Sequence, residues 1–134
     1  MEWMLMPYRR YFDFSGRSRR KEYWMFFLLC AIVYTICNML IMTGMPTIDP
    51  MTGQMSGGGG MLSTIGFALY AIFGLGSLIP SIACAIRRMH DCDKSGWFVL
   101  VPIYNIILAF TPGTKGPNRF GADPKDPTSA AVFA

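Results

Sequence analysis

The residues best equipped for chemistry lie in one short polar stretch, residues 87–97. It holds two arginines, the single histidine of the chain, two aspartates and a lysine. A histidine beside a carboxylate, such as His90 next to Asp91, can titrate near neutrality and act as an acid–base pair. Adjacent positions on a helix do not face each other, however, so this pair would need further groups to orient it. We therefore expect His90 and Asp91 to cap a helix end, and we predict no catalytic residue and no enzyme.

The cysteines offer soft metal ligands at unsuitable spacings. Cys84, His90 and Cys92 lie close together along the chain, but no standard zinc spacing is present and a fourth ligand is missing. The glycines from Gly113 onward follow no strand and open no helix, so a phosphate cradle is not expected. We predict neither a metal nor a cofactor.

The distribution of charge indicates a membrane protein. Hydrophobic residues make up 52% of the chain and charged residues only 15%, well below the usual quarter. Apart from the polar stretch and Asp49, every charge lies before Tyr23 or after Thr114. Residues 23–43 and 61–86 carry no charge, and at 1.5 Å per residue each is long enough to cross a hydrocarbon core of about 30 Å. We predict one all-α membrane domain with two full transmembrane helices.

The basic residues predict the orientation of these spans. Lysines and arginines are concentrated in residues 1–22 and 87–96, which we assign to the cytoplasmic or interfacial N-terminus and to a cytoplasmic loop. The glycine-rich loop 44–60 has no lysine or arginine and is expected outside. The chain is then a multi-pass protein of a bacterial inner membrane with a cytoplasmic N-terminus. Because the positive charge flanks apolar segments, it gives no indication of nucleic-acid binding.

A third apolar segment, residues 97–111, is short and is interrupted by Pro102. Its apolar residues 97–110, about 14 in number, cover roughly 21 Å as a helix, which is less than the bilayer core. The segment could cross a thinned bilayer or re-enter from the cytoplasmic side. The mildly basic tail, residues 112–134, favours the cytoplasm, whereas a third crossing would place it outside. The sequence leaves both alternatives open.

Small residues mark one face of the second span. They recur at intervals of three or four residues, which suits close helix packing, self-association or a membrane partner. They are Gly74, Ser77, Ser81 and Ala85.

Charged side chains from both cytoplasmic segments are expected at one membrane face. An arginine fork binds a carboxylate or a phosphate, so the cluster could lock the helix ends together or hold an anion or lipid headgroup. If the tail returns inside, three of its side chains could join the site. The full set is Arg17, Arg19, Arg20, Glu22, Arg87, Arg88, His90, Asp91, Asn118, Arg119 and Asp123.

Three stretches together resemble the domain of unknown function 805 family, small bacterial inner-membrane proteins. They are residues 14–24, residues 87–91 with 95–97, and residues 112–124, so the resemblance extends from about residue 11 to 124. It implies several helical spans and no assigned reaction. The third apolar segment departs from the family pattern because it is shorter than family members usually carry.

The expected role is that of a small non-enzymatic membrane component. It would act through helix packing and a basic cytoplasmic face that contacts anionic lipid headgroups or a membrane partner. The alternative is a component that transports or handles a lipid or small molecule, suggested by Gly74, Gly76 and Pro80 in the second span and by the short third segment that proline interrupts. Against this alternative, the spans lack the ionisable residues that mark a pathway.

Overall fold

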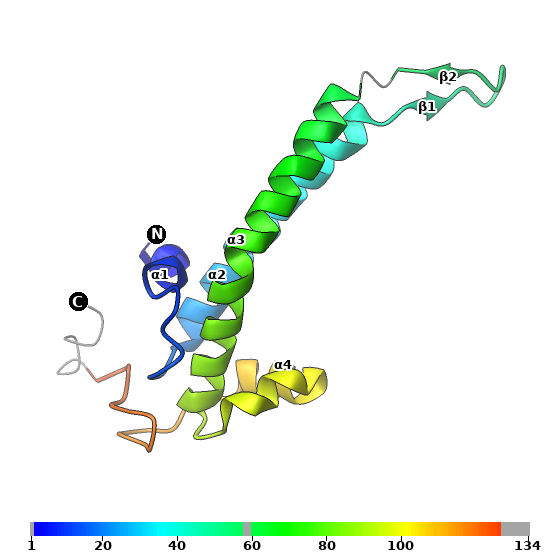
Figure 1. The fold of residues 1–134 in the computed structure, drawn as a ribbon. Coiled ribbons are helices and arrows are strands. Elements are labelled where there is room, and N and C mark those ends of the chain that lie inside the picture. The colour runs from blue at the N-terminus through cyan, green and yellow to red at the C-terminus, as the bar shows by residue number, and fades with distance from the viewer. Residues whose placement is uncertain (1, 58–59, 127–134) are drawn as a thin grey trace. The chain divides into compact units, whose positions relative to one another are not determined.

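The computed structural model describes residues 2–57 and 60–126 of the 134-residue chain, and residues 1, 58–59 and 127–134 lie outside the described part. Its elements follow one another along the chain in Figure 1. They are α1 (Glu2–Arg9), α2 (Arg20–Gly44), β1 (Thr47–Ile48), β2 (Met55–Ser56), α3 (Met61–Asp91), the 3₁₀ helix η1 (Gly96–Leu100) and α4 (Pro102–Phe110).

The two long helices are the candidate membrane spans. α2 has 25 residues and α3 has 31, with mean hydropathies of 2.3 and 1.9 over their most apolar windows. They extend over roughly 37 and 46 Å, so each is longer than the hydrocarbon core. Only 17% and 28% of those windows is buried inside the protein, unlike the core helix of a soluble domain. The structure therefore contains both predicted helices as candidate membrane spans.

α3 extends further than the sequence suggested. The predicted span ended at residue 86, and the helix continues to Asp91, where His90 and Asp91 were expected to cap a helix end. Residues 87–91, predicted as part of the loop 87–96, therefore form the last turns of α3. Helix α2 likewise begins at Arg20, three residues before the predicted charge-free span, which starts at residue 23. Polar residues continue both helices beyond the apolar segments that hydropathy detects.

The glycine-rich loop is also more ordered than expected. Within it, β1 and β2 pair antiparallel, with Thr47 opposite Ser56 and Ile48 opposite Met55. Gly53 adopts φ 65° at the hairpin turn, a left-handed conformation that glycine reaches without steric cost. The all-α prediction is thus correct for the main elements, and two of the four consecutive glycines, residues 58–59, lie outside the described part.

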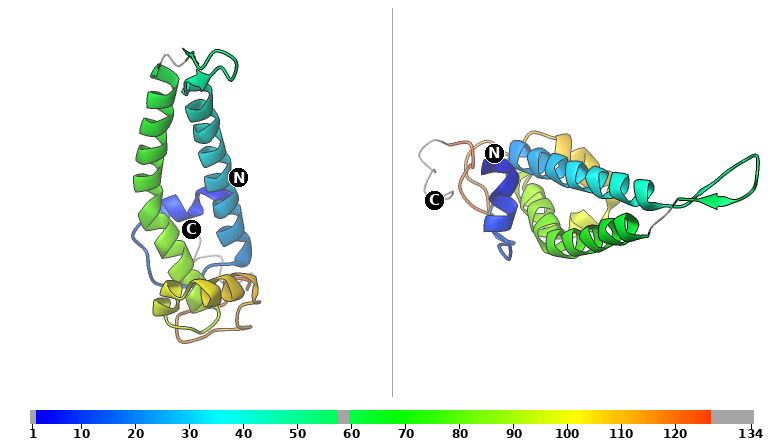
Figure 2. Two further views of the ribbon diagram at one scale, coloured as in Figure 1. Left: turned by 90° about the vertical axis from the view of Figure 1, so that its right-hand side faces the viewer. Right: turned by 90° about the horizontal axis from the view of Figure 1, so that it is seen from above.

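The third apolar segment contains two short helices. Val101 separates η1 from α4 with an extended backbone, as expected for a residue that precedes proline. Pro102 then opens α4, where its missing N–H is not needed. α4 has only nine residues, and it lies across the C-terminal end of α3 rather than alongside it (Figure 2).

The described chain forms two compact units, one built around residues 2–28 with 78–126 and the other from residues 29–77. In the second unit, α2 and α3 run side by side (Figure 2) and approach closely at Gly66. A Cβ atom there would lie 2.7 Å from Ile41 Cγ1 and 3.1 Å from the Cys37 carbonyl oxygen. The Tyr34 ring also packs against Tyr70, with centroids 4.7 Å apart.

This close approach predicts opposite effects for two glycines of α3. Gly66→Ala would force Cβ against the α2 backbone and should reduce the free energy of unfolding by about 1–3 kcal/mol. Gly76 has nothing within 4 Å of its Cβ position, so Gly76→Ala should instead stabilise the helix by about 0.5–1 kcal/mol. Thermal unfolding in detergent micelles measures both. Equal increases in the thermal unfolding midpoints of the two variants would contradict the close packing of α2 against α3 at Gly66.

Candidate functional site

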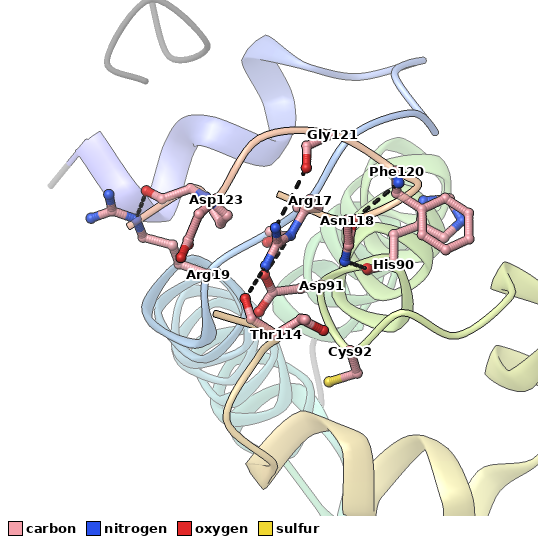
Figure 3. A network of polar contacts seen from close by, with 12 residues as sticks. Arg17, Arg19, His90, Asp91, Cys92, Thr114, Asn118, Phe120, Gly121 and Asp123 are labelled. Carbon is pink, nitrogen blue, oxygen red and sulfur yellow. Dashed lines mark hydrogen bonds and ion pairs between the residues drawn. The ribbon is translucent and has the colours of Figure 1, made fainter. Parts of the chain in front are cut away.

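The Asp91 carboxylate, at the end of α3, binds two guanidinium groups. Arg17 Nε donates to Asp91 Oδ1 at 3.0 Å, and Arg88 Nη1 donates to Asp91 Oδ2. The side chains of all three residues are at most 2% exposed. Arg88 lies in the last turn of α3, where the helix dipole also favours positive charge. Figure 3 shows Arg17 and Asp91 in the surrounding network.

The chain leaves α3 through a Schellman turn that keeps Asp91 in its last helical turn. The Lys94 N–H donates to the Met89 carbonyl, and the Asp93 N–H donates to the His90 carbonyl, both at 3.0 Å. Asp93 occupies the left-handed position with φ 55°. Glycine and asparagine usually fill this position, and here an aspartate occupies it.

Arg17 connects the Asp91 carboxylate to the C-terminal tail. Its Nη2 donates to the Thr114 carbonyl and its Nη1 to the Gly116 carbonyl, the latter at 2.6 Å. The Thr114 N–H donates in turn to the Asp91 backbone carbonyl at 2.8 Å. At Gly113 any Cβ atom would collide with the Asp91 carboxylate. The tail therefore passes directly over Asp91 and is held by Arg17.

Arg88 connects α3 to the C-terminal end of α4 and to the segment that precedes α2. Its Nε donates to the Leu108 carbonyl and its Nη1 to the Ser18 carbonyl, both at 3.2 Å, and its Nη2 donates to the Thr111 carbonyl. The Ser18 N–H donates to the Arg87 carbonyl at 3.1 Å. One buried side chain thus holds the C-terminal end of α4 and the segment that precedes α2.

Arg87 and Glu22 form a second buried ion pair, with Arg87 Nη2 3.4 Å from Glu22 Oε1. Neither side chain is exposed. Glu22 lies in the first turn of α2, where the helix dipole favours a negative charge. Arg87 Nε additionally donates to the Ala83 carbonyl at 3.3 Å. This pair joins the start of α2 to the last turns of α3.

His90 contacts the N-terminal segment and the tail, while both carboxylate oxygens of its neighbour Asp91 bind arginines. Its Nδ1 lies 3.2 Å from the Gly16 carbonyl oxygen. Its ring stacks on Phe120, with centroids 4.0 Å apart and an interplanar angle of 5°. Asn118 Nδ2 donates to the His90 carbonyl at 2.9 Å. Figure 3 shows His90 beside Phe120 and Asn118.

Asp123 closes the tail loop, and the charge of Arg17 also acts on its carboxylate. The N–H groups of Lys125 and Gly116 each donate to its carboxylate at 2.9 Å. The hydrogen bond from Lys125 is the main reason that the pKa of Asp123 is lowered, and the one from Gly116 acts in the same direction. The loop carries the Gly116 carbonyl that Arg17 contacts.

The remaining predicted arginines lie nearer the surface. Arg19 Nε donates to the Pro124 carbonyl, and Arg20 Nη1 donates to the Phe110 carbonyl at 3.1 Å. Arg119 forms an exposed ion pair with Asp93 at 3.1 Å. The predicted set is therefore divided into buried arginines, which bind other parts of the chain, and more exposed ones.

Comparison with known proteins identifies the family. The family model described as "Protein of unknown function (DUF805)" matches residues 11–122. This chain belongs to the DUF805 family. No solved structure matches it.

Two relatives of this DUF805 protein are found in Escherichia coli strain K12. Inner membrane protein YhaH is 40% identical over 133 residues, covering 93% of this chain and 98% of the relative. Inner membrane protein YhaI is also 40% identical, covering 93% of this chain and 97% of the relative. Both names place those relatives in the inner membrane and state no activity. An inner-membrane location of these relatives is consistent with the two candidate spans of the DUF805 chain.

The small-residue stripe of α3 is largely covered within the DUF805 chain. Ser77 is 2% exposed and Ala85 is 7% exposed, while Gly74 and Ser81 are partly buried. Gly74 Cα faces the Tyr34 side chain, whose hydroxyl would lie 3.4 Å from an added Cβ. Self-association remains a prediction, and it would have to use another surface.

Several contacts of the site involve backbone groups that sequence reasoning missed. The carbonyls of Ser18, Leu108, Thr111, Thr114 and Gly116 accept hydrogen bonds from buried arginines. Any residue type supplies a carbonyl, so no side-chain pattern could have indicated them. The glycines of the tail were the one usable signal. Within the described ranges, no group of three or more His, Cys, Asp or Glu residues could hold a metal ion.

The shared carboxylate predicts a large effect of Asp91→Asn. The substitution removes the carboxylate charge that pairs with two buried guanidinium groups, which should cost about 3–5 kcal/mol of stability. Asp93→Asn is the matched control, because the pair of Asp93 with Arg119 is 49% and 62% exposed and contributes under about 1 kcal/mol. Thermal unfolding in micelles compares the two. Similar midpoints for both variants would contradict the proposed role of Asp91.

Proposed function

We propose that this chain is a small, non-enzymatic integral protein of the inner membrane that contacts anionic lipid headgroups through a basic cytoplasmic face. The observation that carries this proposal is a groove lined by two cations and three apolar side chains. Its volume is about 270 Å³, and its lining comprises Arg20, Lys21, Trp24, Met25 and Phe110.

The groove is apolar on one side and held in shape by α4. Trp24 and Phe110 pack with ring centroids 4.6 Å apart. Trp24 Nε1 donates to the Ala109 carbonyl at 3.3 Å, so the amphipathic indole is fixed in place. Tryptophan at this position suits a membrane–water interface, where its polar N–H and apolar ring both find partners. An acyl chain fits against the same side chains.

The two cations of the groove are available to a ligand. Arg20 and Lys21 are exposed, and neither belongs to an ion pair within residues 2–57 and 60–126. Arg20 donates one hydrogen bond to the Phe110 carbonyl, and Lys21 Nζ lies 5.6 Å from the centre of the Trp3 ring. Each such cation near an anionic surface contributes about 1 kcal/mol. Adjacent unpaired cations beside an apolar groove match the charge and shape of an anionic phospholipid.

The same geometry supports a re-entrant or interfacial third segment. η1 follows the turn that ends α3, and the C-terminal end of α4 bonds to Arg20 and Arg88, so both ends of the segment lie beside the C-terminal end of α3. α4 covers roughly 14 Å, about half of the hydrocarbon core. We therefore propose that α4 lies at the cytoplasmic interface and that the tail stays on the cytoplasmic side with the N-terminus.

Lipid selectivity tests this function. The Arg20→Gln, Lys21→Gln double variant should lose the preference for phosphatidylglycerol over phosphatidylcholine, because two charges contribute about 2 kcal/mol, equivalent to roughly 30-fold. Native mass spectrometry of protein equilibrated with an equimolar mixture of both lipids measures this ratio.

The matched control removes the same charge from the tail. Lys115→Gln, Lys125→Gln should retain the preference, since both lysines are exposed and do not line the groove. An unchanged lipid ratio in the Arg20, Lys21 variant, or an equal loss in both variants, would contradict a headgroup site at the groove.

A further inference from the structure

A second cavity lies between the N-terminal segment, the end of α3 and η1. Its volume is about 440 Å³, within the range of small-molecule sites. Two polar side chains, His90 and Ser95, line it together with apolar ones that include Ile82 and Trp97. None of its lining residues belongs to the groove of Arg20 and Lys21.

The imidazole of His90 is held in one tautomer and orientation. A carbonyl oxygen can only accept a hydrogen bond, so the 3.2 Å contact with the Gly16 carbonyl assigns the proton to Nδ1. In the neutral ring, Nε2 then carries a lone pair and accepts a hydrogen bond. The parallel stack on Phe120 fixes the plane of the ring.

Gly96 leaves the Nε2 atom of His90 uncovered. A Cβ atom at this position would lie 3.5 Å from His90 Nε2 and 2.8 Å from Ile86 Cγ2. Any larger residue would therefore fill the space beside Nε2. The absence of a side chain at Gly96 keeps this acceptor next to the cavity.

Ser95 supplies a hydroxyl group on the same cavity. It precedes η1 with φ −62° and ψ 145°, and its side chain makes no capping hydrogen bond. The cavity thus combines one fixed acceptor, one hydroxyl that can donate or accept, and an otherwise apolar lining. Trp97 and Leu100 are 79% and 70% exposed, so the apolar side of the cavity continues onto a surface suited to the acyl region of a bilayer.

We propose that this cavity binds a neutral membrane lipid with a free hydroxyl on its head, of the diacylglycerol type. The lipid hydroxyl donates to His90 Nε2, and an ester carbonyl accepts from the Ser95 hydroxyl. The acyl chains lie along Ile82 and Leu100. A fully ionised phosphate or carboxylate fits poorly, because it has no proton for the lone pair of Nε2.

The chain offers a direct reporter, because His90 is its only histidine. With ¹⁵N-labelled histidine, one pair of imidazole signals reports on Nε2. Dioctanoylglycerol should move the Nε2 resonance upfield as it donates a hydrogen bond, in a saturable manner. Its 3-O-methyl ether, which lacks the hydroxyl proton, should leave the resonance in place and bind about tenfold more weakly, since one buried hydrogen bond is lost.

Two variants complete the experiment. Gly96→Ala should abolish the shift while retaining the His90 signal, and Ser95→Ala should weaken binding while retaining the shift. The ligand comparison uses the unmodified chain, so it decides the question even if a variant does not fold. No shift with dioctanoylglycerol, an equal shift with its ether, or a shift with dioctanoyl phosphatidic acid alone would each overturn the proposal. These outcomes are independent of the lipid preference assigned to Arg20 and Lys21.

Discussion

The buried Asp91 carboxylate, shared by the guanidinium groups of Arg17 and Arg88, is the interaction on which the rest of the structure depends. Burying an ion costs several kcal/mol unless its charge and its hydrogen-bonding groups are all satisfied. One carboxylate balances only one of these two cations. Backbone carbonyls supply the remaining stabilisation: those of Thr114 and Gly116 for Arg17, and those of Ser18, Leu108 and Thr111 for Arg88. The segment before α2, the end of α4 and the tail must therefore dock together.

This constraint separates the basic residues by role. Arg17, Arg87 and Arg88 are buried, and their guanidinium groups face carboxylates and carbonyls of the chain itself. Arg20 and Lys21 are exposed and line a groove with Trp24, so the proposed contact with headgroups belongs to them. The network also fixes His90 between Gly16 and Phe120. The proposed lipid contacts thus lie on surfaces that the buried network holds in place.

Hydropathy predicted the two long helices, because charge-free segments of more than 20 residues have few alternatives to spanning a bilayer. Residue chemistry also predicted that Glu22 and Asp91 would pair with arginines from the two basic motifs. The charge-free span was predicted to end at residue 86, whereas α3 continues to Asp91, where His90 and Asp91 were expected to cap a helix end. The sequence left the course of the tail open, because the tail contacts Arg17 through its own backbone carbonyls and Gly113 leaves room for the Asp91 carboxylate. Apart from the tail glycines, the local sequence contains no signal for such long-range contacts.

The location of the tail tests the central claim most directly. Lys115→Cys, in a variant whose four native cysteines are replaced by serine or alanine, would be treated in intact bacterial cells with a membrane-impermeant thiol reagent. Lys94→Cys, between α3 and η1, and Met51→Cys, in the hairpin, provide the two reference positions. The account predicts that Lys115→Cys and Lys94→Cys are both protected until the cells are opened, whereas Met51→Cys is labelled. Labelling of Lys115→Cys together with Met51→Cys would contradict it, because the tail could not then reach Arg17 and Asp91.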